Sequence, residues 1–306
     1  MDFYNQLLAQ KLSGGGGGGD KYAAFKALVD GSLTEVTAEM LDGITNIRDY
    51  TFAFNRSLKR ITIPPGITSI GDHAFMNSGL QSITILPGVA PINFTSSSYQ
   101  FQNCTNLTSV RTASSIGDYA FRGKNYSAQL TPNIETLELL DGVESIGSYA
   151  FDGTKIASLT FPSSLTEIKG YAFHDTKITS LTVPSTLTKI WDYAFYNCPL
   201  LQNVEFSEGY KRFDVFQNFS NCTALEEVIF PSSLNFVYGY AFSGCNALTR
   251  IIIKATTPPS TRGSTLQFLY GADNAIIYVP SASVDAYKTD SLWSQYADRI
   301  QAIPSD

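Results

Sequence analysis

Residues 165–184, LTEIKGYAFHDTKITSLTVP, decide the fold because the chain repeats this stretch at once. A near copy, LTKIWDYAFYNCPLLQNVEF, occupies residues 187–206, and another copy covers residues 143–162. The Ala-Phe pair therefore places Phe151, Phe173 and Phe195 at intervals of 22 residues. Self-similarity at a fixed period of this length is the signature of a stacked repeat architecture, and it outweighs any local motif.

The phenylalanine that anchors each repeat recurs along most of the chain. Nine anchors can be identified: Phe52, Phe75, Phe101, Phe121, Phe151, Phe173, Phe195, Phe219 and Phe242. The two wider intervals indicate insertions, at residues 93–100 and 122–133. In a solenoid such insertions leave one face as loops, and loops are common contact sites.

Each repeat carries two short patterns of alternating apolar residues, LTEI and ITSLTV in the copy at residues 165–183. Alternation with period two predicts two short strands per turn, with a corner at Pro-Ser and a second turn at Tyr-Ala-Phe. We expect the phenylalanine to fill the interior. Since one repeat cannot bury its own apolar face, neighbours must stack on one another and both ends need caps.

The repeat pattern divides the chain into four segments. Residues 1–20 contain an amphipathic stretch at 2–12 and six glycines at 14–19, which read as a helix followed by a flexible tether, or as a packing element for oligomerisation. Residues 21–43, with a short helix at 21–30, form the N-terminal cap, and residues 44–253 form the array. Residues 254–306 form the C-terminal cap, with a strand at 275–279 and a helical run from Val284. We assign Trp191 and Trp293 to core packing.

Composition limits the classes of function. The chain has 306 residues, 43% of them hydrophobic and 16% charged, and a net charge of −6. That charge argues against a nucleic-acid partner, which requires a basic surface. No apolar run reaches the length of a membrane span. The first residues lack the basic and apolar regions of a secretory signal.

The pattern L-x-x-I-x-x-Y-A-F-x-x-C/T-x-x-[LI]-x-x-[LV]-x-[LVF]-P closely resembles the BspA-like leucine-rich repeats of bacterial surface proteins, over roughly residues 44–253. The motifs AIIYVP at 275–280, AYK at 286–288 and IQAI at 300–303 resemble the ending often seen in that family. The sequence departs from the commoner leucine-rich repeat in having proline where an asparagine ladder would run. The resemblance implies a β-rich leucine-rich repeat solenoid of about nine repeats of 22–23 residues, with a small helical N-terminal cap and an α/β C-terminal cap.

The resemblance also implies a non-enzymatic binding or adhesion surface that takes a protein or glycan partner, without a cofactor. The family normally carries a secretion signal. Because none is seen here, display on a phage particle through residues 1–20 is an alternative to the cell surface, and a cytoplasmic location stays open. Two rival functions are a structural spacer in a phage particle and a carbohydrate-active enzyme that uses carboxylates on inserted loops.

The residues that could carry chemistry are few. Cys104, Cys198, Cys222 and Cys245 each follow a repeat phenylalanine by three residues, and we predict buried apolar thiols and no metal site, since a C-x-x-C pair is missing. His73 and His174 have no obvious catalytic partner residues in the sequence, and we predict that both are surface substitutions. No G-x-S-x-G motif occurs.

The better candidate is the outward face of the longer strands. Side chains alternate along a strand, so two residues per repeat point away from the core. These rows are Arg60/Thr62, Ser82/Thr84, Ser109/Arg111, Thr136/Glu138, Ser158/Thr160, Ser180/Thr182, Asn203/Glu205, Glu227/Ile229 and Arg250/Ile252. Charged and aliphatic residues gather at the C-terminal end, which predicts a ligand strip made of Asn203, Glu205, Glu227, Ile229, Arg250 and Ile252. The alternative is that these residues form an ordinary solvent-exposed sheet face with no ligand.

Overall fold

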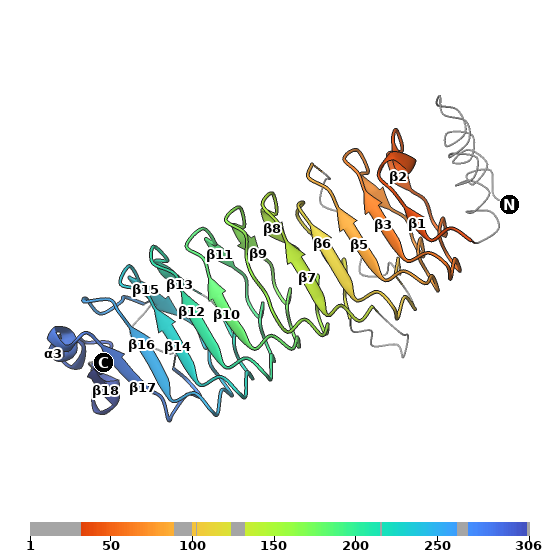
Figure 1. Cartoon of the computed structure of the whole chain (residues 1–306). Coiled ribbons are helices and arrows are strands. Elements are labelled where there is room, and N and C mark those ends of the chain that lie inside the picture. Colours follow the sequence, from red (N-terminus) through yellow and green to blue (C-terminus); the bar gives the residue numbers. More distant parts are fainter. Residues whose placement is uncertain are drawn as a thin grey trace. The chain divides into compact units, whose positions relative to one another are not determined.

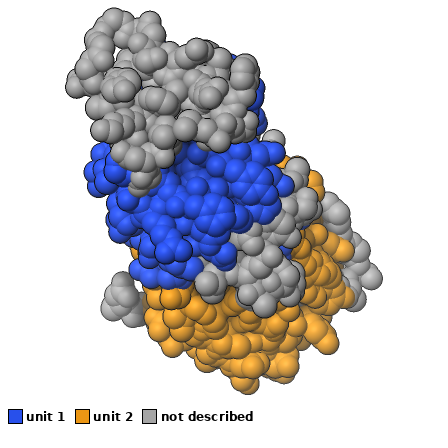
Figure 2. Space-filling view, turned by 90° about the vertical axis from the view of Figure 1, so that its right-hand side faces the viewer, with its two compact units in different colours: residues 1–143 blue, residues 144–306 orange. Residues whose placement is uncertain are grey.

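The computed structural model describes residues 32–88, 100–101, 103–123, 132–214, 216–261 and 269–304. The chain forms two compact units, residues 1–143 and 144–306, which Figure 2 shows in different colours. The expected segments 2–12, 14–19 and 21–30, and most of both insertions, lie outside the described residues. Each unit is built from repeat turns that stack through parallel strands, so the predicted solenoid architecture is confirmed within each of them (Figure 1).

In the first unit, one strand of each turn adds to a five-stranded parallel sheet with the order β1-β3-β5-β6-β7. A second, shorter strand of some turns forms the pair β2-β4. The bounds are β1 (Glu35–Val36), the 3-10 helix η1 (Glu39–Leu41), β2 (Asn46–Ile47), β3 (Arg60–Ile63), β4 (Ser69–Ile70), β5 (Ser82–Ile85), β6 (Ser109–Thr112) and β7 (Thr136–Leu139).

In the second unit, the long strands form a six-stranded parallel sheet with the order β10-β12-β14-β16-β17-β18, here called the long-strand sheet. The short strands form two separate sheets, β11-β9-β8 and β13-β15. The bounds are β8 (Ser145–Ile146), β9 (Glu167–Ile168), β10 (Ser180–Val183), β11 (Lys189–Ile190), β12 (Asn203–Phe206), β13 (Arg212–Asp214), β14 (Glu227–Phe230), β15 (Phe236–Tyr238), β16 (Arg250–Ile253), β17 (Ile276–Val279) and β18 (Ile300–Ala302).

One predicted strand is wrong. Ser158 and Thr160 are exposed on either side of the buried Leu159, as the alternation requires, but residues 154–162 form no strand. The backbone there still accepts hydrogen bonds from the next turn at Ile156 and Ala157. Burial therefore follows the repeat at this position even though the strand itself does not form.

The anchor phenylalanines form a buried aromatic ladder in each unit. In the first unit the ring centroids of Phe52, Phe75, Phe101 and Phe121 lie 5.2–5.4 Å apart. In the second unit the rings of Phe151, Phe173, Phe195, Phe219 and Phe242 are stacked at 5.4–6.0 Å. These spacings are close to the separation of neighbouring strands, about 4.8 Å, so one ring per turn fills the core.

The Tyr-Ala-Phe turn has an unusual backbone that explains its sequence. The residues two before and two after the phenylalanine adopt positive φ, for example Tyr171 (59°) and Asp175 (55°) around Phe173. With this backbone, the N–H groups of Phe173 and Asp175 both donate to carbonyls of the next turn, those of Ala194 and Tyr196. Asparagine, aspartate and glycine recur at the second position because they tolerate positive φ best.

The C-terminal segment extends the long-strand sheet instead of only covering it. β17 and β18 pair in parallel with β16 and with each other. Between them lie the 3-10 helix η2 (Ser281–Ser283), α3 (Val284–Thr289) and the 3-10 helix η3 (Ser294–Arg299). Trp293 is 0% exposed, contacts Tyr287 and donates from Nε1 to the carbonyl of Pro259 at 2.8 Å, so its predicted core role is confirmed.

Candidate functional site

The six residues predicted as a ligand strip come together on one face of the long-strand sheet. The register aligns Asn203 with Glu227 and Glu227 with Arg250 in one row. It aligns Glu205 with Ile229 and Ile229 with Ile252 in the neighbouring row. All six side chains are exposed or half-buried, whereas their chain neighbours on β12, β14 and β16 point into the core. The geometry on which the strip depends is therefore present.

The strip continues onto β17, which the sequence analysis assigned to the cap and did not include. Ile276 pairs with Arg250, and Tyr278 pairs with Ile252. Both side chains are half-buried on the outward face. The sequence contains a signal for this extension, because residues 275–279 show the same period-two alternation as the repeat strands. We call the eight residues Asn203, Glu205, Glu227, Ile229, Arg250, Ile252, Ile276 and Tyr278 the outward strip.

Charged and apolar groups of the outward strip are held in place by one another. Arg250 donates from Nε to Glu227 Oε2 at 2.8 Å, and its guanidinium carbon lies 5.0 Å from the centre of the Tyr278 ring. The hydrogen bond with Glu227 raises the pKa of Arg250, so the guanidinium stays charged. Lys254 Nζ lies 3.9 Å from Glu205 Oε1. The result is an oriented arginine beside the apolar groups Ile229, Ile252 and Ile276.

The matching face in the first unit differs in chemistry. It has the same kind of cross-strand ion pair, since Arg111 Nε lies 2.9 Å from Glu138 Oε2 and Arg60 lies 2.8 Å from Glu35. Its remaining outward residues on β3 and β5 are Thr62, Ser82 and Thr84. The ion pair is thus a recurring feature of the repeat, and the apolar component distinguishes the outward strip.

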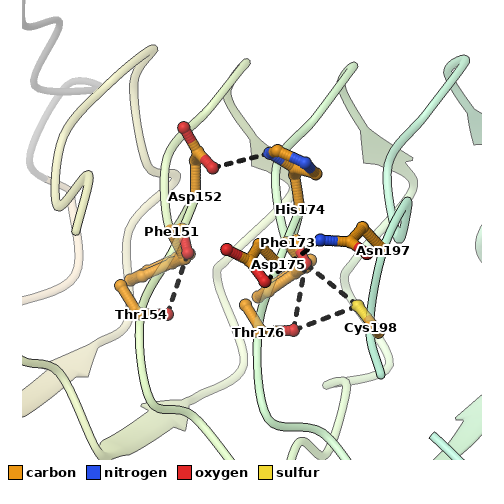
Figure 3. Close-up of polar contacts among 9 residues, drawn as sticks. All are labelled: Phe151, Asp152, Thr154, Phe173, His174, Asp175, Thr176, Asn197 and Cys198. Atoms are coloured by element: carbon orange, nitrogen blue, oxygen red, sulfur yellow. Dashed lines mark hydrogen bonds and ion pairs between the residues drawn. The ribbon is translucent and has the colours of Figure 1, made fainter. Parts of the chain in front are cut away.

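The prediction that His174 is a surface substitution is wrong. His174 Nδ1 lies 2.7 Å from Asp152 Oδ1, and their side chains are only 14% and 1% exposed. Figure 3 shows the two side chains turned toward one another from adjacent turns. The ring of His174 also stacks on Tyr196 at 5.4 Å. His73 is likewise half-buried and stacks on Tyr50 at 5.0 Å. Both histidines belong to ladders that link neighbouring turns.

The four cysteines are buried, as predicted. Each thiol donates to the carbonyl of the anchor phenylalanine in the preceding turn, as Cys245 does to Phe219 at 3.0 Å and Cys198 does to Phe173 at 3.3 Å. Thr154 and Thr176 occupy the same repeat position, and their hydroxyls donate to the phenylalanine carbonyl of their own turn (Figure 3). The cysteine at this position is therefore a donor to a buried carbonyl as well as an apolar group.

The prediction that Trp191 packs in the core is wrong. Its side chain is 45% exposed on the short-strand side of the second unit, directly after β11. Its indole Nε1 donates to Glu167 Oε1 at 2.8 Å, and Lys189 Nζ lies 3.9 Å from the ring centre. The hydrogen bond from Trp191 holds the pKa of Glu167 below its ordinary value. The repeat alignment carries a signal for this exposure, because Trp191 follows Ile190 as Lys169 follows Ile168 and as Gly147 follows Ile146, at a position that is not part of the apolar pattern.

Two features that would indicate a metal site or a membrane span are absent from the residues that the structure describes. No group of three or more His, Cys, Asp or Glu side chains in that part of the chain is placed to hold a metal ion. Within the same residues, no helix has both the length and the apolar character needed to cross a bilayer.

Comparisons with known proteins agree with the repeat architecture. A family model described as "BspA type Leucine rich repeat region" matches in six copies, over residues 23–133, 123–249 and 215–259. A leucine-rich repeat protein from Bacteroides ovatus has a similar structure at 19% identity and a TM-score of 0.50, covering 86% of this chain and 76% of that one. A leucine-rich cell surface protein from Faecalibacterium prausnitzii matches at 20% identity and a TM-score of 0.39, covering 86% and 84% of the two chains. The comparison with curated proteins gave no match.

Proposed function

Because the chain belongs to the BspA-type leucine-rich repeat family, we propose that it is a non-enzymatic recognition module that binds a protein partner at a bacterial surface. The family suggests a protein-binding or adhesion module in general terms. The observation that carries the finer proposal is the outward strip, in which Arg250 and Tyr278 lie beside three isoleucines. The partner contacts this strip.

The chemistry of the outward strip suits a protein surface. Interface centres are enriched in arginine and aromatic residues, and their energy comes from a few anchors surrounded by polar groups. Arg250 is already oriented by Glu227, so little side-chain freedom remains to be lost on binding. Asn203, Glu205 and Lys254 supply a polar rim on one side. A partner with an apolar centre and a polar border would complement this arrangement.

A location at the surface follows from the proposed role and agrees with the usual location of the family. The protein has two alternative sites of display, the cell envelope or a phage particle to which residues 1–20 would attach it. Antibody labelling of producing cells and of particles released after prophage induction separates them. Label on neither surface would contradict the proposed role.

Binding is tested with the fluorescent full chain on cultured epithelial cells and on immobilised matrix proteins. We expect saturable binding that is lost when the cells are first treated with trypsin, because the proposed partner is a protein. The double variant R250A/E227A should weaken binding about tenfold or more, as the loss of one interface anchor does. Removing both members of the pair avoids leaving one charge without its partner.

The matched control is R111A/E138A, which removes the same kind of ion pair from the first unit. Exposed ion pairs contribute only about 0–1 kcal/mol to stability, so both variants should fold, which circular dichroism checks. Equal loss of binding in the two variants, or binding that survives trypsin, would contradict a protein partner on the outward strip.

A further inference from the structure

A hollow of about 290 Å³ lies on the short-strand side of the second unit, where the sheet β11-β9-β8 ends and β13-β15 begins. β11 and β13 belong to consecutive turns, and Arg212 and Asp214 occupy the repeat positions of Lys189 and Trp191. Among the described strands, however, β11 pairs with β9 and β13 pairs with β15. The side chains at this break in strand pairing line the hollow instead of continuing a regular stack from one turn to the next.

One wall of the hollow is the exposed indole of Trp191. Glu167 on β9 accepts the indole N–H at 2.8 Å, and Lys189 on β11 lies over the ring. Both contacts come from the β9–β11 side, while Tyr210, Arg212 and Asp214 line the hollow from the segment 210–214. The ring is therefore fixed in orientation and still 45% exposed. A preorganised, exposed aromatic surface favours a ligand with a flat apolar face.

Both cations around the hollow are paired with carboxylates, and one further carboxylate, that of Asp192, gives a small excess of negative charge. Arg212 lies 3.1 Å from Asp214 and over the ring of Phe236 at 3.9 Å. Lys189 lies 3.2 Å from Glu167, and Asp192 accepts a hydrogen bond from the backbone N–H of Phe216. A charged ligand would have to disrupt these pairs. The groups can still donate and accept further hydrogen bonds, since a carboxylate has about four acceptor sites and a guanidinium has five N–H donors.

Tyr210 supplies a second observation that points to a ligand. Its side chain lines the hollow and is only 6% exposed. Its hydroxyl forms no hydrogen bond with the described residues and is not itself sealed from solvent, so it can bond to a group placed in the hollow. Burial, followed by the nearby carboxylate of Asp214, raises the pKa of Tyr210, so the hydroxyl remains a neutral donor.

We propose that this hollow binds one neutral sugar residue of a glycan, with the pyranose ring against Trp191 and its hydroxyls bonded to Tyr210, Asp192, Arg212 and Asp214. A sugar ring presents apolar C–H groups on one face and hydroxyls that both donate and accept around its edge. The hollow offers the Trp191 ring to the C–H face and polar side chains to the hydroxyls, and its one surplus carboxylate disfavours an anionic sugar. Its volume lies at the small end of the roughly 300–1,000 Å³ range of ligand pockets, which suits a single residue. The site is separate from the outward strip and goes beyond the proposed protein partner.

Trp191 itself reports on binding. The chain has two tryptophans, and Trp293 is buried, so acrylamide quenching of fluorescence measures the exposure of Trp191. The probes are the neutral disaccharides cellobiose, maltose, lactose and chitobiose, with sialyllactose as the charged comparison. We expect at least one neutral probe to protect Trp191 from acrylamide in a saturable manner, and calorimetry to give the same affinity. Sialyllactose should bind more weakly than lactose.

Two variants test the contacts with that probe by calorimetry. Trp191→Ala should weaken binding about tenfold or more, because the stacking surface is lost. Asp214→Asn keeps the size of the side chain and should also weaken binding. Leu200→Ala, which truncates another exposed apolar side chain outside the hollow, should bind as the unaltered chain does.

Three results would overturn the sugar site: no binding by any neutral probe at millimolar concentration, equal binding by Trp191→Ala, or binding by sialyllactose alone. The cell-binding experiment with R250A/E227A does not depend on these results. Loss of the sugar site would leave the outward strip untouched, and the reverse also holds.

Discussion

At the scale of single residues, the position three after each anchor phenylalanine shows how the repeat uses cysteine. Burial raises the pKa of the Cys104 thiol to about 11 and that of Cys245 to about 12. Burial likewise raises the pKa of Cys222. The thiolate is the reactive form of cysteine, and these thiols are both protonated at neutral pH and inaccessible. The same S–H groups donate to phenylalanine carbonyls.

We therefore expect a thiol reagent to label the native chain slowly. Because all four thiols are buried, Ellman's reagent at pH 8 should react with less than one of the four cysteines on a scale of minutes. After unfolding in guanidinium chloride all four should react at once. Rapid reaction of two or more thiols in the native chain would show that the turns open readily and that the buried carbonyl contacts are not maintained.

At the scale of the repeat element, the Tyr-Ala-Phe turn depends on two residues with positive φ. The second of these is glycine in two turns of the second unit, Gly153 (73°) and Gly244 (79°), and asparagine in others, such as Asn197 (57°). Asn197 also donates from Nδ2 to Asp175 Oδ1 at 3.2 Å, which links two turns. The hydrogen bond to Asp175 and the positive φ therefore both favour asparagine at position 197.

Substitution at Asn197 separates these two effects. Asn197→Gly loses the part-buried hydrogen bond to Asp175, but glycine adopts positive φ without strain, so stability should fall by at most about 1 kcal/mol. Asn197→Val forces a β-branched residue into positive φ and should cost about 1–3 kcal/mol more. Chemical denaturation followed by circular dichroism measures both, with Leu200→Ala in the same turn as the control. Equal stability of the two variants would contradict the backbone argument.

The element scale also shows what the sequence could and could not predict. The anchor period gave the ladder Phe151–Phe242 and the two strands per turn, because burial in a repeat fixes the same side chains in every copy. The alternation of residues on β12, β14 and β16 likewise placed Arg250 beside Glu227. These predictions are confirmed because they depend only on the repeat period and on the alternation of side chains along a strand.

Features that depend on irregularities between turns were not predictable. No repeat pattern marks the break between β11 and β13, which places the exposed Trp191 beside the segment 210–214. The pairing of His174 with Asp152 joins residues 22 positions apart that occur together only in these two turns. The absence of a strand around Leu159 is a third example, since its sequence alternates as the others do.

At the scale of the whole molecule, the second unit offers two surfaces of different chemistry. The long-strand sheet carries an arginine, a tyrosine and three isoleucines in register, which suits a protein partner. The short-strand side carries the polar hollow around Trp191, which suits a sugar. We expect the protein partner to contact the long-strand face of the second unit.

The measurement that tests this claim most directly is site-specific photo-crosslinking to cell-surface proteins. A benzophenone amino acid is placed at Tyr278 on the outward strip, at Trp191 in the hollow, or at the exposed Tyr50 of the first unit. The chain carrying the probe at position 278 should form a discrete protein crosslink that excess unlabelled chain abolishes, and the other two should not. Crosslinking at position 50 or 191 with none at position 278 would contradict the assignment of the recognition face.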